Sequence, residues 1–257
     1  MSEATLPMPK AALVTGAAQR IGAAIAKRLA ADGWAVAVHH RSSREAADAL
    51  AAEIARSGGR AVALAADLSR EAELEALVRR AADALGPLGA LVNNASVFER
   101  DEALTVTRDS WDRHVETNLR APFVLMQLFA RQLPAECGGA IINILDERVW
   151  KLTPHFVSYT LSKAGLWTLT QTMALALAPR IRVNGIGPGP TLPSPRQSEE
   201  QFRRQWTSMP LGRGTTPEEI AEAARFILAA PAMTGQMIAL DGGQHLLWGG
   251  AGSSSSE

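Results

Sequence analysis

The sequence is poor in cysteine and carries no excess of charge of either sign. Its single cysteine, Cys137, excludes an internal disulfide, fits a reducing compartment and lies in no context that would activate a thiolate. Lys plus Arg equals Asp plus Glu at 26 each, and there is no long basic run. We therefore do not expect nucleic acid or an anionic membrane surface as a partner.

Long apolar runs and metal-binding patterns are also missing. No stretch approaches the roughly 20 apolar residues that cross a bilayer, and residues 1–9 lack the apolar segment of a secretory signal. The five histidines show no metal-ligand spacing, so we expect no metal. These absences predict a cytoplasmic domain whose apolar fraction of 47% can fill a sizeable core.

Strand and helix patterns alternate along the chain, which favours an α/β fold with a parallel sheet. A helix is expected after the first strand, and further helices are expected at residues 42–57, 71–85, 108–133 and 156–177. The last of these is apolar nearly all round, which requires burial on more than one side and suggests a subunit contact. The expected strands are residues 10–15, 34–39, 60–65, 89–93, 140–145, 181–186 and 236–240.

The first strand pattern leads into a glycine-bounded turn. Lys10–Thr15 reads as a strand, Gly16 to Gly22 follows, and a helical run then continues to Ala31. In this arrangement backbone N–H groups and the helix dipole face the pyrophosphate of a dinucleotide. The alternative is that the two glycines only make a turn and a close helix–strand contact.

The residues after the second strand indicate which dinucleotide is bound. NAD sites place an acidic residue there, whereas an arginine accommodates the 2′-phosphate of NADP. This chain has His39-His40-Arg41-Ser42-Ser43 and no acidic residue until Glu45, which favours NADP. The guanidinium of Arg41 can pair with a phosphate, and both serines can donate to it. The alternative is that Arg41 is a surface residue and Ser42 only a helix cap.

A tyrosine and a lysine form a candidate catalytic pair. The apolar strand Ile141–Leu145 ends in Asp146, and Tyr159 and Lys163 follow at a spacing that places them on one helix face. An ammonium beside a phenol favours the phenolate, so we expect Lys163 to lower the pKa of Tyr159 and make it a proton donor near neutral pH. Asp146 is the candidate third member, or alternatively a cap of the following loop.

These pieces occur in the order found in the short-chain dehydrogenase/reductase family, which the chain resembles from about Lys10 to Leu247. The resemblance implies a single-domain Rossmann fold with a doubly wound, seven-stranded parallel sheet, helices on both faces, NAD or NADP as cofactor, and a homotetramer. It is carried by Thr15-Gly16-x-x-x-x-Ile21-Gly22, Asp67-Leu68, Asn93-Asn94-Ala95, Asn118, Tyr159-x-x-x-Lys163, Arg182-Val183-Asn184, Pro188-Gly189 and Asp241-Gly242-Gly243.

Three departures from the family's common pattern narrow the resemblance. Arg20 replaces the middle glycine of the first turn, Asp146 replaces the usual catalytic serine, and Ser96-Val97-Phe98 replaces a second glycine. All three occur together in pteridine reductases and the related dihydromonapterin and dihydrofolate reductases. There the arginine and the phenylalanine hold the pterin ring, and the aspartate stands with the tyrosine and lysine. The alternatives are a solvated Arg20 and a core Phe98.

The resemblance also implies the site residues. Asn118, Asp146, Tyr159 and Lys163 would be catalytic, with Asn118 marking a helix irregularity that holds a water linked to the lysine. The substrate residues would be Arg20, Ser96, Phe98, Asp146 and Tyr159. The cofactor residues would be Gly16, Arg20, Ile21, His39, Arg41, Ser42, Ser43, Asp67, Leu68, Asn94, Ala95, Ser96, Tyr159, Lys163, Pro188 and Gly189.

Composition divides the chain into one domain and two tails. We expect a flexible N-terminus at residues 1–9, an NADP-binding reductase domain at 10–248 and a disordered Gly/Ser tail at 249–257. Residues 191–214 are rich in proline and polar residues, with a short helical piece at 199–206. Such a long loop reads as a lid over the substrate.

The predicted function is NADPH-dependent hydride transfer to the C=N of a dihydropterin or dihydrofolate, giving the tetrahydro form. Phe98 would stack on the flat ring, and Tyr159 would donate the proton. Two alternatives stay open. A carbonyl or 3-oxoacyl thioester reductase is disfavoured because an ionised aspartate repels a developing alkoxide. A non-enzymatic NADP-binding protein is disfavoured because both Tyr159 and Lys163 are retained.

Overall fold

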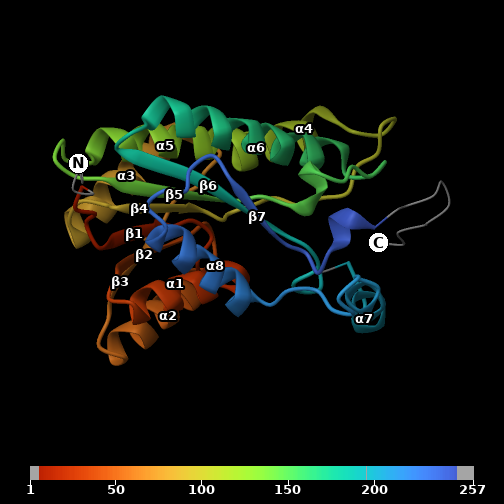
Figure 1. Cartoon of the computed structure of the whole chain (residues 1–257), viewed down its shortest axis with the longest axis horizontal. Coiled ribbons are helices and arrows are strands. Elements are labelled where there is room, and N and C mark those ends of the chain that lie inside the picture. The colour runs from red at the N-terminus through yellow and green to blue at the C-terminus, as the bar shows by residue number, and fades with distance from the viewer. Residues whose placement is uncertain (1–5, 195, 248–257) are drawn as a thin grey trace.

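The computed structural model describes residues 6–194 and 196–247, which contain one parallel seven-stranded sheet (Figure 1). Its spatial order is β3-β2-β1-β4-β5-β6-β7, which confirms the doubly wound α/β fold. The predicted tail 249–257 and most of the predicted flexible N-terminus lie outside the described residues. All predicted strands are present, as Ala11–Val14 (β1), Ala35–His40 (β2), Arg60–Ala65 (β3), Ala90–Asn93 (β4), Gly139–Ile144 (β5), Ile181–Pro188 (β6) and Met237–Leu240 (β7).

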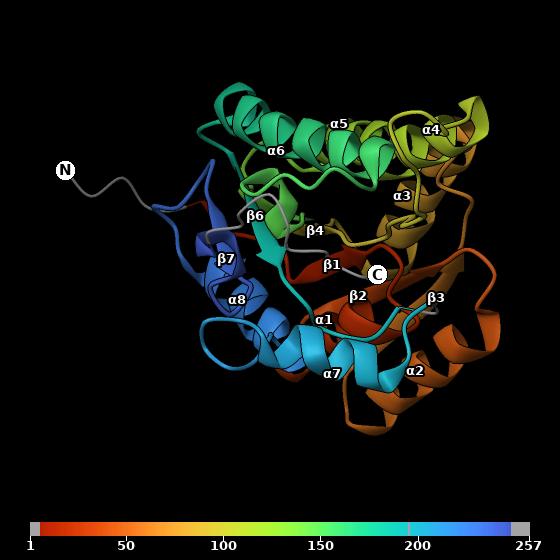
Figure 2. The same cartoon turned by 90° about the vertical axis from the view of Figure 1, so that its right-hand side faces the viewer.

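Helices cover both faces of the sheet (Figures 1 and 2). Because side chains alternate along a strand, Leu13 of β1 joins the core on one face and Val14 joins the core on the other. One face carries α1 (Arg20–Ala31), α2 (Arg44–Arg56) and α8 (Pro217–Ala229). The other carries α3 (Glu71–Leu85), α5 (Ala121–Gln132) and α6 (Val157–Leu177), and α4 (Arg108–Val115) packs against α6 on the same side.

The helix predicted at residues 108–133 is present but is not one continuous α-helix. A π-helical turn, η1 (Glu116–Arg120), separates α4 from α5. It contains Asn118, where the family resemblance implied an irregularity. Turns of this kind occur frequently at functional sites.

Helix α8 was not among the predicted helices, although its start is encoded in the sequence. The Thr216 hydroxyl accepts a hydrogen bond from the Glu219 N–H at 3.2 Å, and the Glu219 carboxylate accepts one from the Thr216 N–H at 2.9 Å. This is a capping box, and Pro217 occupies the first helical position, which suits a residue without an N–H. The pattern Thr-Pro-x-Glu before an apolar run was therefore a usable signal.

The loops that follow β1, β4, β5 and β6 meet at the carboxyl edge of the sheet, where the strand order reverses between β1 and β4. Helix α7 (Glu199–Thr207) lies outside the two helix layers and contributes to this edge (Figure 2). It falls within the segment predicted to be a lid. In the part of the chain that the structure describes, no helix has the length and apolarity required to span a membrane.

A buried histidine fixes the glycine turn after β1 to the neighbouring strands. The Gly16 N–H donates to His39 Nδ1 at 3.0 Å, and His39 Nε2 lies 3.0 Å from the Ala66 carbonyl oxygen. The ring must therefore accept at Nδ1 and donate at Nε2, which only the neutral imidazole does. Burial lowers the pKa of His39 to about 4.

This protonation state predicts a loss of stability in acid. Folded His39 stays neutral down to a pH of about 4, whereas an unfolded histidine takes up a proton below about pH 6.5. The free energy of unfolding should therefore fall between those two pH values, by about 3 kcal/mol from this group. His39→Asn keeps an acceptor for Gly16 but cannot titrate, so its stability should fall less. Urea unfolding near neutral pH and near pH 4 measures both losses, and equal losses would contradict the assignment.

Candidate active site

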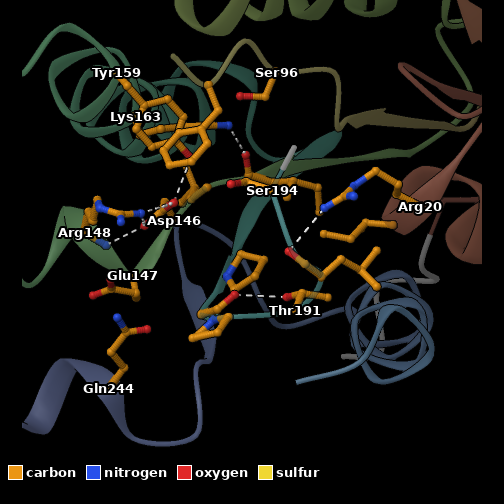
Figure 3. A pocket seen from close by; sticks show the side chains of 18 of the residues that line it. Arg20, Ser96, Asp146, Glu147, Arg148, Tyr159, Lys163, Thr191, Ser194 and Gln244 are labelled. Carbon is orange, nitrogen blue, oxygen red and sulfur yellow. Dashed lines mark hydrogen bonds and ion pairs between the residues drawn. The ribbon is translucent and has the colours of Figure 1, made fainter. Parts of the chain in front are cut away.

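Two adjoining cavities lie at the carboxyl edge of the sheet. The turn-side cavity, about 410 Å³, is bounded by Gly16, residues 18–22, residues 39–43, Asp67 and Leu68. The tyrosine-side cavity, about 260 Å³, lies between the end of β5, α6 and residues 188–194 (Figure 3). The residues that line both cavities are Arg20, Ile21, Asn94 and Ser96.

The turn-side cavity has the backbone geometry of a phosphate site. A Cβ on Gly22 would lie 2.4 Å from the Gly16 carbonyl oxygen and 2.6 Å from Asn94 Nδ2, so only glycine lets α1 begin this close to the turn. Gly16 adopts a φ of +60°, and Asn94 Nδ2 donates to the carbonyl oxygens of Thr15 and Gly16 at 2.8 and 3.1 Å. The first turn of α1 thus faces a preformed cavity, as a pyrophosphate site requires.

The structure places every predicted cofactor residue on one of the two cavities. Tyr159, Lys163, Pro188 and Gly189 line the tyrosine-side cavity, and the others line the turn-side cavity. His39 contributes only its ring surface, because both of its nitrogens contact backbone groups. The predicted set omitted His40, whose buried Nδ1 has no partner within the described residues and which also lines the turn-side cavity.

The predicted catalytic residues from β5 and α6 converge (Figure 3). The Tyr159 hydroxyl donates to Asp146 Oδ2 at 2.7 Å, and Lys163 Nζ donates to the Ile144 carbonyl oxygen at 2.8 Å. Asp146 Oδ1 also accepts from the Arg148 N–H at 2.9 Å, which caps the short helix η2 (Glu147–Val149). Asp146 therefore caps the loop and contacts the phenol at the same time.

The predicted effect of Lys163 on the pKa of Tyr159 is wrong for this structure. Burial and the negative charge of Asp146 raise the pKa of Tyr159 well above its ordinary value. The Lys163 ammonium lies 5.9 Å from the centre of the tyrosine ring and is bonded to a backbone carbonyl instead. Burial lowers the pKa of Lys163 to about 8. The phenol therefore keeps its proton, which a proton donor must do.

Arg20 joins the first turn to the predicted lid. Its backbone has a φ of 56°, a left-handed conformation that costs a residue with a Cβ about 1–2 kcal/mol. Its guanidinium donates to the carbonyl oxygens of Pro193 at 3.1 Å and Leu192 at 3.3 Å. Strain of this kind persists where neighbouring contacts hold it, frequently at ligand sites.

Phe98 lies against Tyr159 and a second phenylalanine. The rings of Phe98 and Phe156 stack with centres 4.5 Å apart and planes 10° apart, and the ring of Tyr159 contacts Phe98 edge-on at 4.7 Å. Phe156 covers one face of Phe98, and the guanidinium carbons of Arg148 and Arg196 lie 5.5 and 5.3 Å from the centre of the Phe98 ring. Phe156 itself has a φ of 58° at the start of α6 and was not predicted as a site residue.

Asn118 is buried and lines neither cavity. Its Oδ1 accepts from the Val97 N–H at 2.8 Å and the Ser96 hydroxyl at 3.2 Å. Its Nδ2 donates to the Val97 carbonyl oxygen at 2.9 Å and the Ser162 hydroxyl at 3.1 Å. In this structure it ties the loop that carries Ser96 and Phe98 to α6.

Several lining residues of the tyrosine-side cavity were not predicted from the sequence. Glu147 and Arg148 directly follow Asp146, and their position was the only signal for them. The composition of residues 191–214 predicted that this segment covers the substrate but not which of its residues line the cavity, and nothing predicted Pro190 or the residue from the 3₁₀ turn η3 (Gln244–Leu246). These residues are Pro190, Thr191, Leu192, Ser194, Gln197, Phe202, Gln205 and Gln244.

Known proteins resemble this chain along nearly its whole length. A family profile described as "Enoyl-(Acyl carrier protein) reductase" matches residues 16–245. The 3-oxoacyl-[acyl-carrier-protein] reductase FabG of Staphylococcus aureus (strain Mu50) is 33% identical over 246 residues, which are 94% of this chain and 100% of that protein.

Solved structures share both the fold and a larger part of the sequence. FolM Alternative dihydrofolate reductase 1 from Brucella canis, complexed with NADP, has a TM-score of 0.93 and 46% identity, covering 98% of this chain and 100% of that chain. A short-chain dehydrogenase/reductase from Serratia marcescens has a TM-score of 0.86 and 36% identity, covering 92% of this chain and 98% of that chain.

The raised pKa of Tyr159 is directly measurable because this is the only tyrosine in the chain. Absorbance at the tyrosinate band should show the wild-type phenol still protonated well above the ordinary pKa of about 10. Asp146→Asn removes the negative charge but keeps an acceptor oxygen, so the pKa of Tyr159 should fall relative to wild type. Tyr159→Phe supplies the blank that removes the tryptophan contribution. An Asp146→Asn variant that titrates at the same or a higher pH would contradict the role of the carboxylate.

Proposed function

This chain belongs to the short-chain dehydrogenase/reductase family, and on that premise we propose that it is an NADPH-dependent reductase of dihydropterins or dihydrofolate. The observation that carries the proposal is the hydrogen bond from the Tyr159 hydroxyl to Asp146 Oδ2. A carboxylate at this position disfavours the alkoxide that forms from a ketone, but it assists proton transfer to a ring nitrogen. The likeness to the Brucella canis FolM dihydrofolate reductase, at 46% identity, supports the same substrate class.

The turn-side cavity fits NADP. The close approach of α1 to the turn suits the pyrophosphate, and the unpartnered buried Nδ1 of His40 belongs to a residue that lines the same cavity. Arg41, Ser42 and Ser43 would hold the 2′-phosphate, because no acidic residue follows β2 directly. Asp67 and Leu68 would line the adenine end, and Lys163 would hold the nicotinamide ribose. The similar Brucella canis protein was solved as a complex with NADP, which supports this assignment.

The residues of the tyrosine-side cavity supply binding and proton transfer. Bound NADPH supplies a hydride to the substrate carbon of the C=N bond. Tyr159 donates a proton to the nitrogen, so that the double bond becomes CH–NH. Asp146, whose side chain is 14% exposed, accepts the hydroxyl of Tyr159 and can pass a solvent proton back to it. Phe98 lines this cavity and would stack on the flat ring.

The second candidate is reduction of a carbonyl group or a 3-oxoacyl thioester. The description of the matching family and the likeness to FabG of Staphylococcus aureus favour it. Both candidates use Tyr159 and Lys163 in the same way, so these two residues do not separate them. Asp146 does, because a neutral hydroxyl there would donate to a carbonyl oxygen and a carboxylate does not.

We also propose that the protein is a cytoplasmic homotetramer. Helix α6 exposes Leu161 by 46% and Leu175 by 84%, and Phe226 on α8 is 58% exposed. Exposed apolar side chains on helices that are otherwise packed are typical of subunit contacts. Light scattering after size-exclusion chromatography should give the mass of four chains, and a monomeric mass would contradict the proposal.

Arg41→Asp should shift cofactor preference from NADPH toward NADH. Loss of a charge-assisted contact to the 2′-phosphate costs about 1.5–3 kcal/mol, or roughly a 10- to 100-fold rise in the NADPH dissociation constant. Fluorescence titration of both cofactors measures this change. Arg44→Asp is the matched control, since Arg44 is exposed on α2 and does not line the cavity. A wild type that binds NADH as tightly as NADPH would contradict the cofactor assignment.

NADPH oxidation with dihydrobiopterin, dihydrofolate, a simple ketone and a 3-oxoacyl thioester tests the substrate class. Asp146→Ser should lower dihydropterin turnover at least about tenfold, a modest general acid–base effect. It should also shift the activity ratio toward the ketone, because the serine hydroxyl donates to a carbonyl oxygen. If wild type reduces ketones well and dihydropterins not at all, the second candidate replaces the first.

A further inference from the structure

A buried polar cluster contacts both the loop that carries Phe98 and the start of α6. Its members are Asp101, Ser110, His114 and Ser158. A serine, a histidine and an acid are the residue types of a hydrolytic triad, but the cluster lines neither cavity. The Asp101 carboxylate accepts from both serine hydroxyls rather than from the histidine. The cluster therefore offers no nucleophile that a substrate can reach, and its role lies in the segments that it connects.

His114, on α4, must be neutral to make its hydrogen bonds. The Glu99 N–H donates to His114 Nε2 at 3.0 Å, so this nitrogen carries no proton. The proton of the neutral ring is then on Nδ1, which lies 2.9 Å from the Ser110 carbonyl oxygen and 2.7 Å from the Ser158 hydroxyl. An imidazolium would place a second donor against the Glu99 N–H and break this contact.

Burial favours the same protonation state, because it lowers the pKa of His114. The Ser110 carbonyl and the carboxylates of Asp101 and Glu99 oppose this shift without reversing it. The charge of Arg113 acts in the same direction as burial. The neutral ring is therefore the form present at neutral pH.

His114 bonds the immediate neighbours of two aromatic residues of the tyrosine-side cavity. Glu99 directly follows Phe98, and Ser158 directly precedes Tyr159. The ring of His114 also contacts the ring of Tyr159 edge-on, with centres 6.0 Å apart. One side chain therefore joins the two segments whose aromatic rings, Phe98 and Tyr159, meet at 4.7 Å.

Asn118 holds the chain on the other side of Phe98. It lies four residues after His114, where a helix brings two side chains to the same face. Asn118 bonds the N–H of Val97 at 2.8 Å and the carbonyl oxygen of Val97 at 2.9 Å. The backbone on both sides of Phe98 is thus fixed from successive turns of one helical segment, and the ring moves only if one of these anchors breaks.

We propose that His114, in its neutral form, is a positioning residue that holds Phe98 against Tyr159 and thereby sets the aromatic wall on which a flat substrate ring stacks. The proposal rests on the proposed function for the substrate ring and goes beyond it by assigning the residue that places the wall.

The first test compares His114→Asn with His114→Gln. An asparagine amide reaches the position of Nδ1 but not of Nε2, so the Glu99 N–H loses its acceptor. The dissociation constant of dihydrobiopterin from NADP⁺-loaded protein should then rise at least about fivefold. A glutamine oxygen reaches the position of Nε2, so His114→Gln should stay within about threefold of wild type.

Isothermal titration calorimetry measures these affinities, and unchanged NADP⁺ affinity shows that the variants are folded. At saturating dihydrobiopterin, turnover by His114→Asn should stay within about threefold of wild type, because Tyr159 keeps its bond to Asp146. The proposal is overturned if His114→Asn binds dihydrobiopterin as wild type does, or if His114→Gln is impaired as much as His114→Asn.

A second readout needs no substrate, because Tyr159 is the only tyrosine in the chain. Incorporated fluorotyrosine therefore gives a single fluorine NMR signal, whose position reports the ring of Phe98 beside it. His114→Asn should shift this signal and His114→Gln should leave it near the wild-type position. The matched control is His155→Gln, which changes another histidine near the same loop and should leave the signal unshifted.

A third readout uses wild type alone, so it holds even if His114→Asn fails to fold. Nitrogen NMR of the His114 ring should show Nδ1 protonated and Nε2 bare at neutral pH, with a coupling from Nε2 across the hydrogen bond to the Glu99 amide. A proton on Nε2 would contradict the proposal.

The substrate and spectroscopic results separate failure of the proposed function from failure of this proposal. If wild type neither binds nor reduces dihydrobiopterin while the fluorine and nitrogen signals behave as expected, the proposed function fails and the role of His114 stands. If wild type reduces dihydrobiopterin and His114→Asn keeps both the affinity and the signal of wild type, the role of His114 alone fails.

Discussion

The site depends on a set of hydrogen bonds that fix α6 against β5. Each joins a polar group at the end of the strand to a side chain of a helix that is otherwise mostly apolar. A polar group left unpaired in this interior would cost free energy, so a slip of the helix along the strand would break all of them together. The pairs are Asn143 with Thr170 at 2.9 Å, the Ile144 carbonyl oxygen with Lys163 at 2.8 Å, and Asp146 with Tyr159 at 2.7 Å.

A second set of buried contacts places the loop that carries Phe98. Asp101 accepts from the Ser110 hydroxyl at 2.9 Å and the Ser158 N–H at 3.2 Å, one residue before Tyr159. Asn118 ties the preceding residues of the same loop to α6. The loop and the helix are therefore held from both sides, which keeps the ring of Phe98 against Tyr159. These hydrogen bonds therefore position the aromatic side chains that line the cavity.

The sequence alone predicted those features of the fold and the site that depend only on residues close together in the chain. The strands were predictable because both faces of the sheet are buried, and the turn was predictable because Gly16 and Gly22 are required by close backbone contacts. The shared face of Tyr159 and Lys163 follows from helix geometry alone. Helix α8 was missed although its capping box is present in the sequence.

What the sequence did not predict depends on contacts between distant elements. The pKa of Tyr159 is raised rather than lowered because its hydroxyl is buried and because a carboxylate from the end of β5 lies against it. Glu147 lies in η2, which contacts η3 almost a hundred residues further along the chain, and the charge of Asp241 helps to raise the pKa of Glu147. No periodicity or motif in the sequence predicts these contacts between distant residues. The same contacts determine the protonation states of the side chains in the cavity.

Two consecutive carboxyl groups therefore have different hydrogen-bonding roles in one cavity. Asp146 accepts from the Tyr159 hydroxyl and from the N–H of Arg148, with the Arg148 guanidinium 3.3 Å away. Glu147 has no such donors among the described residues at its Oε2, and burial together with the Asp146 carboxylate raises its pKa to about 8. Many active sites give two neighbouring acids different roles by placing them in environments that move their pKa values apart. The chemistry proposed for dihydropterins and for ketones uses Tyr159 and Lys163 alike, so the proposed choice between the two substrate classes rests on Asp146.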